Sequence, residues 1–298
     1  MTLETRVILS YYPGCSLEGM NKAYDKSARL VTKALGIDLR ELNDWNCCGA
    51  SAYMSIQELR AHLLSARNLA LAEREGKDLV VVCPACLTTL TKSNRYMAED
   101  PKLRRTVASA LKAADLQYSG SVKVRHLLEV ILNDIGEQEV KAKVTKPLSG
   151  LKVAPYYGCQ FTRPFGDFDD KEFPVMLDTL LAWLGAEPVD FPLKAKCCGG
   201  MLMTTNESVG LGLVRGLLDC AAQNGAECVA TICPLCHITL EAYQGNVNKR
   251  FGTHFQLPTL YFTQLIGLAF GFSRKELGIN EELISSKAVL QRHAEAAR

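Results

Sequence analysis

Ten of the twelve cysteines form a pattern that occurs twice along the chain. In each half a single cysteine precedes an adjacent pair and then a Cys-Pro-x-Cys motif, with spacings C-x31-CC-x34-C-x2-C and C-x37-CC-x34-C-x2-C. An adjacent pair is awkward as a disulfide and cramped as two corners of one tetrahedral ion, so the pattern favours a site with several metal atoms. The ten residues are Cys15, Cys47, Cys48, Cys83, Cys86, Cys159, Cys197, Cys198, Cys233 and Cys236.

An iron–sulfur site accounts for all ten cysteines, because thiolates are the usual ligands of such clusters. Structural zinc stays open as an alternative, although four ligands suffice for zinc and a fifth thiol would be surplus. A thiol-exchange motif at Cys83 and Cys86 would explain neither the repeat nor the other cysteines. Cys220 and Cys228 lie outside the repeat, and we expect them to be buried apolar residues.

The composition narrows the class of protein. The chain has 298 residues, 48% of them hydrophobic and 22% charged, as in ordinary soluble globular proteins. A net charge of +2 gives no electrostatic case for nucleic-acid binding. The first nine residues do not resemble a secretory signal, and the longest apolar stretch, near 257–272, is too short and polar to span a bilayer. We therefore expect a cytoplasmic protein that is not integral to a membrane, in which disulfides are disfavoured.

Other cofactor motifs are missing from the sequence. There is no G-x-G-x-x-G fingerprint after an expected strand, so we expect neither flavin nor a nicotinamide cofactor (NAD) on this chain. There is also no C-x2-C-x2-C-x3-C-P run of the ferredoxin type. Electrons would therefore have to come from another protein.

The cysteines follow short segments with the composition of strands. Short β-branched or continuously apolar runs predict the strands, and apolar residues at helical spacing predict the helices. Residues 137–150 are charged and punctuated by Pro and Gly, which predicts a linker. In the first half we expect strands at 6–12, 38–42 and 79–83, and helices at 22–35, 57–75, 94–119 and 124–135.

The second half repeats this order, with strands expected at 152–157 and 228–233 and helices at 172–184 and 209–224. Asp169 and Asp170 are typical of a helix N-cap before the first of these helices. Matching positions are offset by 149 or 150 residues from Gly36/Gly185 onward, which indicates duplication. We therefore predict an α/β fold of two units, 1–145 and 146–298, with small, mostly parallel sheets flanked by helices. Ligands of such sheets bind beyond the C-terminal strand ends, so two metal sites should face each other across a pseudo-twofold axis.

Several motifs closely resemble the B subunit of heterodisulfide reductase and its bacterial homologues, over about residues 6–278. They are YYPGC ending at Cys15, WNCCGA over 45–50, YYGCQ over 156–160, CCGG over 197–200 and LYFTQL over 260–265. The resemblance implies that each unit is a CCG domain holding one noncubane 4Fe-4S cluster through its five cysteines. It also implies a disulfide substrate between the two clusters, with each cluster passing one electron and binding one product sulfur.

The resemblance further implies two partners. One is a small subunit with cubane iron–sulfur clusters, similar to the C subunit of that family, and the other is a flavin subunit similar to its A subunit. We expect Lys196 and Arg163 to hold an anionic group of the substrate, and His237 to donate a proton to a leaving thiolate or hydrogen-bond a cluster sulfide. Each of these three side chains could instead be structural or solvated. We interpret the other four histidines as structural or exposed.

The expected function is that of the catalytic subunit of a heterodisulfide reductase-like complex, which interconverts a disulfide and two thiols. The substrate and the direction of the reaction stay open. A second enzyme hypothesis is an electron-relay or membrane-docking subunit of a dehydrogenase complex of succinate, lactate or glycolate type. A zinc-stabilised scaffold is the alternative from a different class.

Overall fold

Two four-stranded parallel sheets form the centre of the protein. The computed structural model describes residues 7–50 and 53–296. The strand orders are β2-β1-β3-β4 and β6-β5-β7-β8, so the two sheets have the same topology, and every pairing within them is parallel. This confirms the predicted α/β fold with two repeated units. The strands are β1 Val7–Tyr12, β2 Ile37–Glu41, β3 Leu79–Val81, β4 Val124–His126, β5 Lys152–Tyr156, β6 Glu187–Pro188, β7 Cys228–Thr231 and β8 Thr259–Tyr261.

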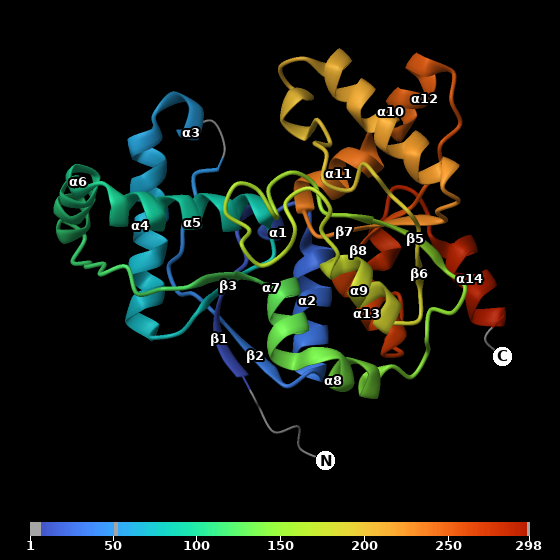
Figure 1. The fold of residues 1–298 in the computed structure, drawn as a ribbon, viewed down its shortest axis with the longest axis horizontal. Helices are drawn as coiled ribbons and strands as arrows, with labels where there is room; N and C mark the ends of the chain where they lie inside the picture. Colours follow the sequence, from blue (N-terminus) through green and yellow to red (C-terminus); the bar gives the residue numbers. More distant parts are fainter. Residues whose placement is uncertain (1–6, 51–52, 297–298) are drawn as a thin grey trace.

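Helices flank both sheets, and α2 lies between the two halves of the molecule (Figure 1). The glycines expected to stop helices, Gly36, Gly76, Gly185 and Gly225, all have positive φ angles. The α-helices are α1 Cys15–Glu18, α2 Lys22–Ala34, α3 Tyr53–Ile56, α4 Glu58–Glu75, α5 Pro84–Glu99, α6 Pro101–Lys112, α7 Leu127–Val130, α8 Gly136–Lys143, α9 Met176–Trp183, α10 Glu207–Gln223, α11 Pro234–Ala242, α12 Gln244–Phe251, α13 Phe262–Ala269 and α14 Lys287–Ala296. A π-helix, η1, covers Ile131–Ile135, and the 3-10 helices η2 and η3 cover Gly200–Leu202 and Ile279–Glu281.

The prediction of one helix over 124–135 was wrong at its start. Val124 to His126 form strand β4, because these residues pair in register with Leu79 to Val81 of β3. The apolar residues at helical spacing lie in α7 and η1, which directly follow β4. The expected linker 137–150 was also partly wrong, since it contains most of α8.

Two other helix boundaries differ from the expectation. The helical region 94–119 is interrupted at Asp100, whose carboxylate accepts hydrogen bonds from the first turn of α6. Helix α9 begins at Met176 rather than near residue 172. Asp169 still stabilises the start of α9, because the Asp169 carboxylate accepts hydrogen bonds from the Val175 and Met176 amides. Asp170 instead stabilises the preceding turn, where its carboxylate accepts hydrogen bonds from the Glu172 and Phe173 amides.

The hydrophobic core extends across both halves. One cluster of buried residues runs from Leu9 in β1 to Ile279 in η3, and a second cluster lies within the C-terminal half, from Ala154 in β5 to Leu257. Helix α13 packs against α2, where Ser27 Oγ and Thr263 Oγ1 are 2.7 Å apart. The division into two domains at residues 145 and 146 stays a prediction, because the two sheets share this core.

No helix in the described part of the chain is both long and apolar enough to cross a membrane.

Candidate metal centre

The repeated cysteines lie just beyond the C-terminal ends of parallel strands. Cys83 follows β3 and is the N-cap residue of α5, and Cys233 follows β7 and is the N-cap residue of α11. In both helices a proline occupies the first turn, where its missing N–H costs no hydrogen bond. Cys15 and Cys159 follow β1 and β5 in the same way. The strand ends therefore deliver the thiols of each half to one edge of its sheet.

Matching tyrosines fix the loops that carry the adjacent cysteine pairs. Tyr12 Oη donates to the carbonyl of Asn46 at 2.8 Å, and Tyr156 Oη donates to the carbonyl of Lys196 at 2.8 Å. Each of these carbonyls belongs to the residue directly before a Cys-Cys pair. The same hydrogen bond thus positions the pair in both halves.

The thiols within each half are close neighbours. In the first half, the Sγ atoms of Cys15 and Cys47 are 4.0 Å apart, and those of Cys48 and Cys86 are 3.4 Å apart. The corresponding thiols interact in the second half, Cys159 with Cys197 and Cys198 with Cys236.

The two sites also lie next to each other. The thiols of Cys83 and Cys233, one from each half, are near enough that their interaction lowers the pKa of Cys83 and raises that of Cys233. The carbonyls of the residues directly before them, Val82 and Ile232, lie 3.0 and 2.9 Å from one hydroxyl, that of Tyr24. The sequence predicts two sites that face each other, and the structure places them side by side at these two cysteines.

The electrostatics favour thiolates at matching positions. Hydrogen bonding from Cys15 and Cys48 lowers the pKa of Cys47 to about 2, and Cys159 and Cys198 lower the pKa of Cys197 to about 2. A thiolate is the form that binds metal. By contrast, burial raises the pKa of Cys228 to about 12, so this residue stays a neutral thiol in the core.

All twelve cysteines are free thiols, and thiolates are the usual ligands of iron–sulfur clusters. Among residues 7–50 and 53–296, no group of three or more His, Cys, Asp or Glu side chains is arranged so as to hold a metal ion. The assignment of the ten repeated cysteines as cluster ligands therefore stays a prediction. Cys228 is buried as expected, whereas Cys220 on α10 is only half-buried.

Two side chains that the sequence analysis did not assign to the site lie where its halves meet. Tyr24 Oη on α2 lies 3.0 Å from the carbonyl oxygen of Val82 and 2.9 Å from that of Ile232. His126 Nε2 at the end of β4 lies 3.1 Å from the Val82 carbonyl oxygen. The two carbonyls directly precede Cys83 and Cys233.

His126 is fully buried, and burial lowers its pKa to about 4, so it is neutral. Its Nδ1 accepts a hydrogen bond from the Leu128 amide, which leaves the proton on Nε2 for the Val82 carbonyl. Tyr24 stacks on Tyr261, with ring centroids 3.9 Å apart. Tyr261 is the last residue of β8, and His126 is the last residue of β4, so the two residues occupy matching positions in the two sheets. The sequence pattern does not reveal this match, because it predicts a helix where β4 lies.

Lys196 and Arg163 have different surroundings. Lys196 is exposed beside Cys197, and its amino group has no hydrogen bond or ion pair with the described residues. Arg163 lies nearby, but its guanidinium already binds the Ala195 carbonyl and the Glu172 carboxylate. Lys196, whose charge is unpaired among the described residues, is therefore better placed than Arg163 to bind an anionic ligand. The substrate role of both residues stays a prediction.

His237 lies between the thiols and a small cavity of about 190 Å³. Its ring stacks on Tyr261 at 4.1 Å, and its Nδ1 is 3.7 Å from the Glu241 carboxylate. Burial lowers the pKa of His237 to about 4, which makes it neutral at pH 7 and an unfavourable acid in the resting protein. Among the other histidines, His62 is buried and its Nδ1 pairs with Ser93 Oγ at 2.9 Å.

Comparisons with known proteins agree with this geometry. The family model described as "CCG: Cysteine-rich domain" matches residues 9–91 and 153–241, one match in each half. The chain therefore belongs to the CCG cysteine-rich domain family. All ten repeated cysteines lie within these two matches, five in each.

Three relatives of known name are similar over nearly their whole length. The "8-methylmenaquinol:fumarate reductase membrane anchor subunit" of Wolinella succinogenes is 36% identical, over 93% of this chain and 97% of its own. The B subunit of the ferredoxin/F(420)H(2)-dependent CoB-CoM heterodisulfide reductase of Methanosarcina acetivorans is 33% identical, over 93% and 94%. A protein of Archaeoglobus profundus named as similar to the B subunit of heterodisulfide reductase is 31% identical, over 89% and 91%.

A solved structure shares the fold. The crystal structure of a hypothetical protein from Helicobacter pylori aligns with a TM-score of 0.74 at 16% identity and covers 93% of this chain. This chain spans about half, 52%, of that longer one. The family and the relatives together support an electron-transfer subunit of an oxidoreductase complex, with a cysteine-rich site of iron–sulfur type.

Replacing Tyr24 by Phe tests the link between the two sites. The variant keeps the ring and its stack on Tyr261 but removes the hydroxyl donor from two buried carbonyls, which should cost about 1–3 kcal/mol of stability. We expect faster release of iron to a chelator from both sites. The matched control is Tyr118→Phe, which removes a hydroxyl that binds Asn94 far from the thiols. Equal iron release from the two variants would contradict the role of Tyr24.

Replacing Gly158 by Ala tests the second site alone. Gly158 has φ +71°, and an added Cβ would lie 3.0 Å from Cys236 Sγ. Gly225→Ala is the control, because Gly225 has φ +76° and nothing within 4 Å of the added atom. Both variants carry similar backbone strain, about 1–2 kcal/mol. We expect iron analysis to show loss from the second site in Gly158→Ala only, and equal iron in both variants would argue against a crowded thiol site.

Proposed function

We propose that this chain is the catalytic subunit of a heterodisulfide reductase-like complex and that it interconverts a disulfide and two thiols. The single observation that carries the proposal is that two matched five-thiol sites adjoin at Cys83 and Cys233, whose preceding carbonyls lie 3.0 and 2.9 Å from the same Tyr24 hydroxyl. Cleavage of a disulfide takes two electrons, and two one-electron carriers beside the same bond can supply them. The names of the relatives from Methanosarcina and Archaeoglobus support this assignment.

The thiol sets fit two noncubane 4Fe-4S clusters. Cys15, Cys47, Cys48, Cys83 and Cys86 would hold one cluster, and the five cysteines of the second half the other. When bound, these clusters would supply one electron each and an iron atom that accepts a product sulfur. The low pKa of Cys47 and of Cys197 favours the thiolate form that iron ligation requires.

The side chains of the protein would orient the substrate asymmetrically. Lys196 in the second half corresponds to Asn46 in the first, and the two residues behave differently. The Asn46 amide binds the Cys47 and Leu64 carbonyls, whereas the Lys196 amino group is exposed and unpaired within residues 7–50 and 53–296. An anionic group of the substrate would therefore bind beside the second site. Arg163 would keep the Lys196 loop in place through Ala195, and His237 would stay a neutral hydrogen-bond donor.

The proposed partners follow from the electron supply. A small subunit with cubane iron–sulfur clusters would pass electrons to this chain. A flavin subunit would in turn supply electrons to the small subunit. The proposed compartment is the cytoplasm. Neither flavin nor a nicotinamide cofactor is proposed on this chain.

An electron-relay subunit is the second candidate function. It is favoured by the Wolinella succinogenes relative, whose name is that of a membrane anchor subunit of a fumarate reductase. In a relay the same two sites would exchange electrons without binding a substrate sulfur.

Electron paramagnetic resonance on anaerobically purified protein tests the catalytic proposal. With 2-mercaptoethanesulfonate, a small anionic thiol, we expect a new signal from sulfur binding at iron. Cys159→Ser should abolish or alter the signal by removing one ligand of the second site. Cys220→Ser is the control, because this residue lies outside the repeat on α10. Reversible reduction of both sites with no thiol-induced signal would instead establish the relay function.

Replacing Lys196 by Gln tests the anchoring of the substrate. We expect KM for an anionic disulfide to rise about tenfold with kcat little changed, because one charge-assisted contact of about 1.4 kcal/mol is lost. KM for a neutral disulfide should not change. Lys102→Gln is the control, since Lys102 is exposed on α6. An equal effect on the anionic and the neutral substrate would show that Lys196 does not select charge.

A further inference from the structure

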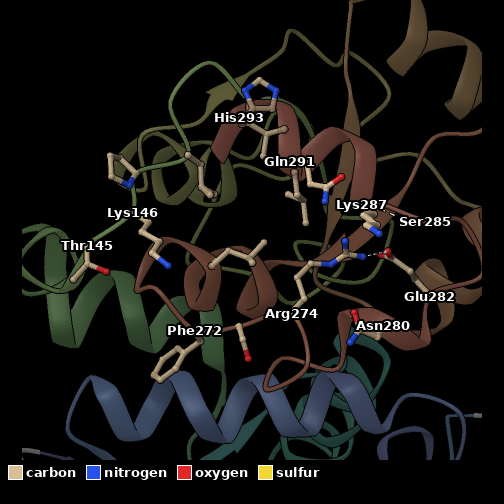
Figure 2. A pocket seen from close by; sticks show the side chains of 16 residues that line it. Thr145, Lys146, Phe272, Arg274, Asn280, Glu282, Ser285, Lys287, Gln291 and His293 are labelled. Atoms are coloured by element: carbon tan, nitrogen blue, oxygen red, sulfur yellow. Dashed lines mark hydrogen bonds and ion pairs between the residues drawn. The ribbon is translucent and has the colours of Figure 1, made fainter. Parts of the chain in front are cut away.

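A large cavity, drawn from close by in Figure 2, lies at the N-terminal end of β5 and is lined by none of the repeated cysteines. Its volume is about 980 Å³. Leu151, which lines it, directly precedes β5, whereas the thiols follow the C-terminal ends of the strands. The walls come from the segment after α8, from the end of α13 and from α14. The cavity is therefore separate from the candidate metal centre.

The inner surface of the cavity is mainly apolar. Leu148 and Leu151 are buried beneath it, and Leu268, Phe272 and Leu290 are half-buried at its sides. Its volume is at the upper end of the range for pockets that take ligands of drug size or larger. A small inorganic ion would leave most of this apolar surface in contact with water, so the shape favours a ligand with a long hydrocarbon part.

Positive charge gathers at the edge of the cavity. Lys146 and Lys287 line it, and neither amino group forms an ion pair or a hydrogen bond within the described part of the chain. Figure 2 shows the Lys146 amino group extending into the cavity, with Arg274 and Lys287 together on the other side. Arg274 is neutralised by Glu282, to which it is bound at 2.8 Å. The two lysines therefore leave the cavity with a net positive charge.

Two buried polar atoms at the same wall also lack partners. Arg274 Nε and Glu282 Oε2 are inaccessible to solvent and form no hydrogen bond with the described residues. A buried donor without a partner costs stability unless a ligand or water satisfies it. Both atoms are closed to solvent, so neither is counted among the groups that would hold the head group of a ligand.

We propose that this cavity binds an amphipathic monocarboxylate of the long-chain fatty acid class. The hydrocarbon chain would lie on Leu148, Leu151 and Leu268, which removes apolar surface from water. The carboxylate would lie at the edge, between Lys146 and Lys287. The proposal does not depend on the function of the thiol sites, because none of the ten repeated cysteines lines the cavity.

Equilibrium dialysis of radiolabelled oleate against the intact, anaerobically purified protein tests the proposal. We expect one oleate per chain, displaced by unlabelled oleate but not by methyl oleate, which lacks the charge. The double variant Lys146→Glu/Lys287→Glu should weaken binding at least about tenfold, since two attractive charges become repulsive. Leu290→Trp should also weaken binding by filling the cavity.

The matched control is Lys102→Glu/Lys112→Glu, which makes the same change of net charge on α6, outside the cavity. It should bind oleate like the unmodified protein, and all variants should keep their thermal midpoints and iron contents. Absence of oleate binding would overturn the proposal. Oleate binding that is equally weakened by the control, or unaffected by both cavity variants, would also overturn it.

Discussion

The carbonyl groups of Val82 and Ile232 both lie within hydrogen-bonding distance of the Tyr24 hydroxyl, and this shared contact holds the ends of β3 and β7 together. Buried carbonyls need hydrogen-bond partners, and His126 Nε2 is a second partner for Val82. Since each carbonyl directly precedes a cysteine, separating the ends of β3 and β7 would remove at least one carbonyl from Tyr24. This constraint keeps the cysteines of the two halves next to each other.

The two halves share a plan but not every side chain. The strand order, the tyrosine that fixes each Cys-Cys loop and the proline after Cys83 and Cys233 are the same in both. The side chains around the thiols differ, as Lys196 replaces Asn46 and Tyr261 replaces His126. A duplicated fold thus provides two similar thiol sites, while these substitutions make the surroundings of the two sites different.

Much of the fold could be predicted from the sequence because its signals are local. The apolar runs of β3 and β7 and the glycines after α2 and α9 mark the same elements in both halves, and the cysteine spacing marks the repeat. Strand β4 could not be recognised, because its three residues run directly into a helix and only pairing with β3 makes them a strand. The role of Tyr24 was equally hidden, since its two partners are 58 and 208 residues away.

The most direct test of the account is the content of iron, acid-labile sulfide and zinc in protein purified without oxygen. If each half holds one 4Fe-4S cluster, each chain will contain about eight iron and about eight sulfide ions with little zinc. Stoichiometric zinc without sulfide would contradict the account and would make the thiol sites structural. About four iron ions per chain would show that only one half holds a cluster, so that two-site cleavage of a disulfide could not occur.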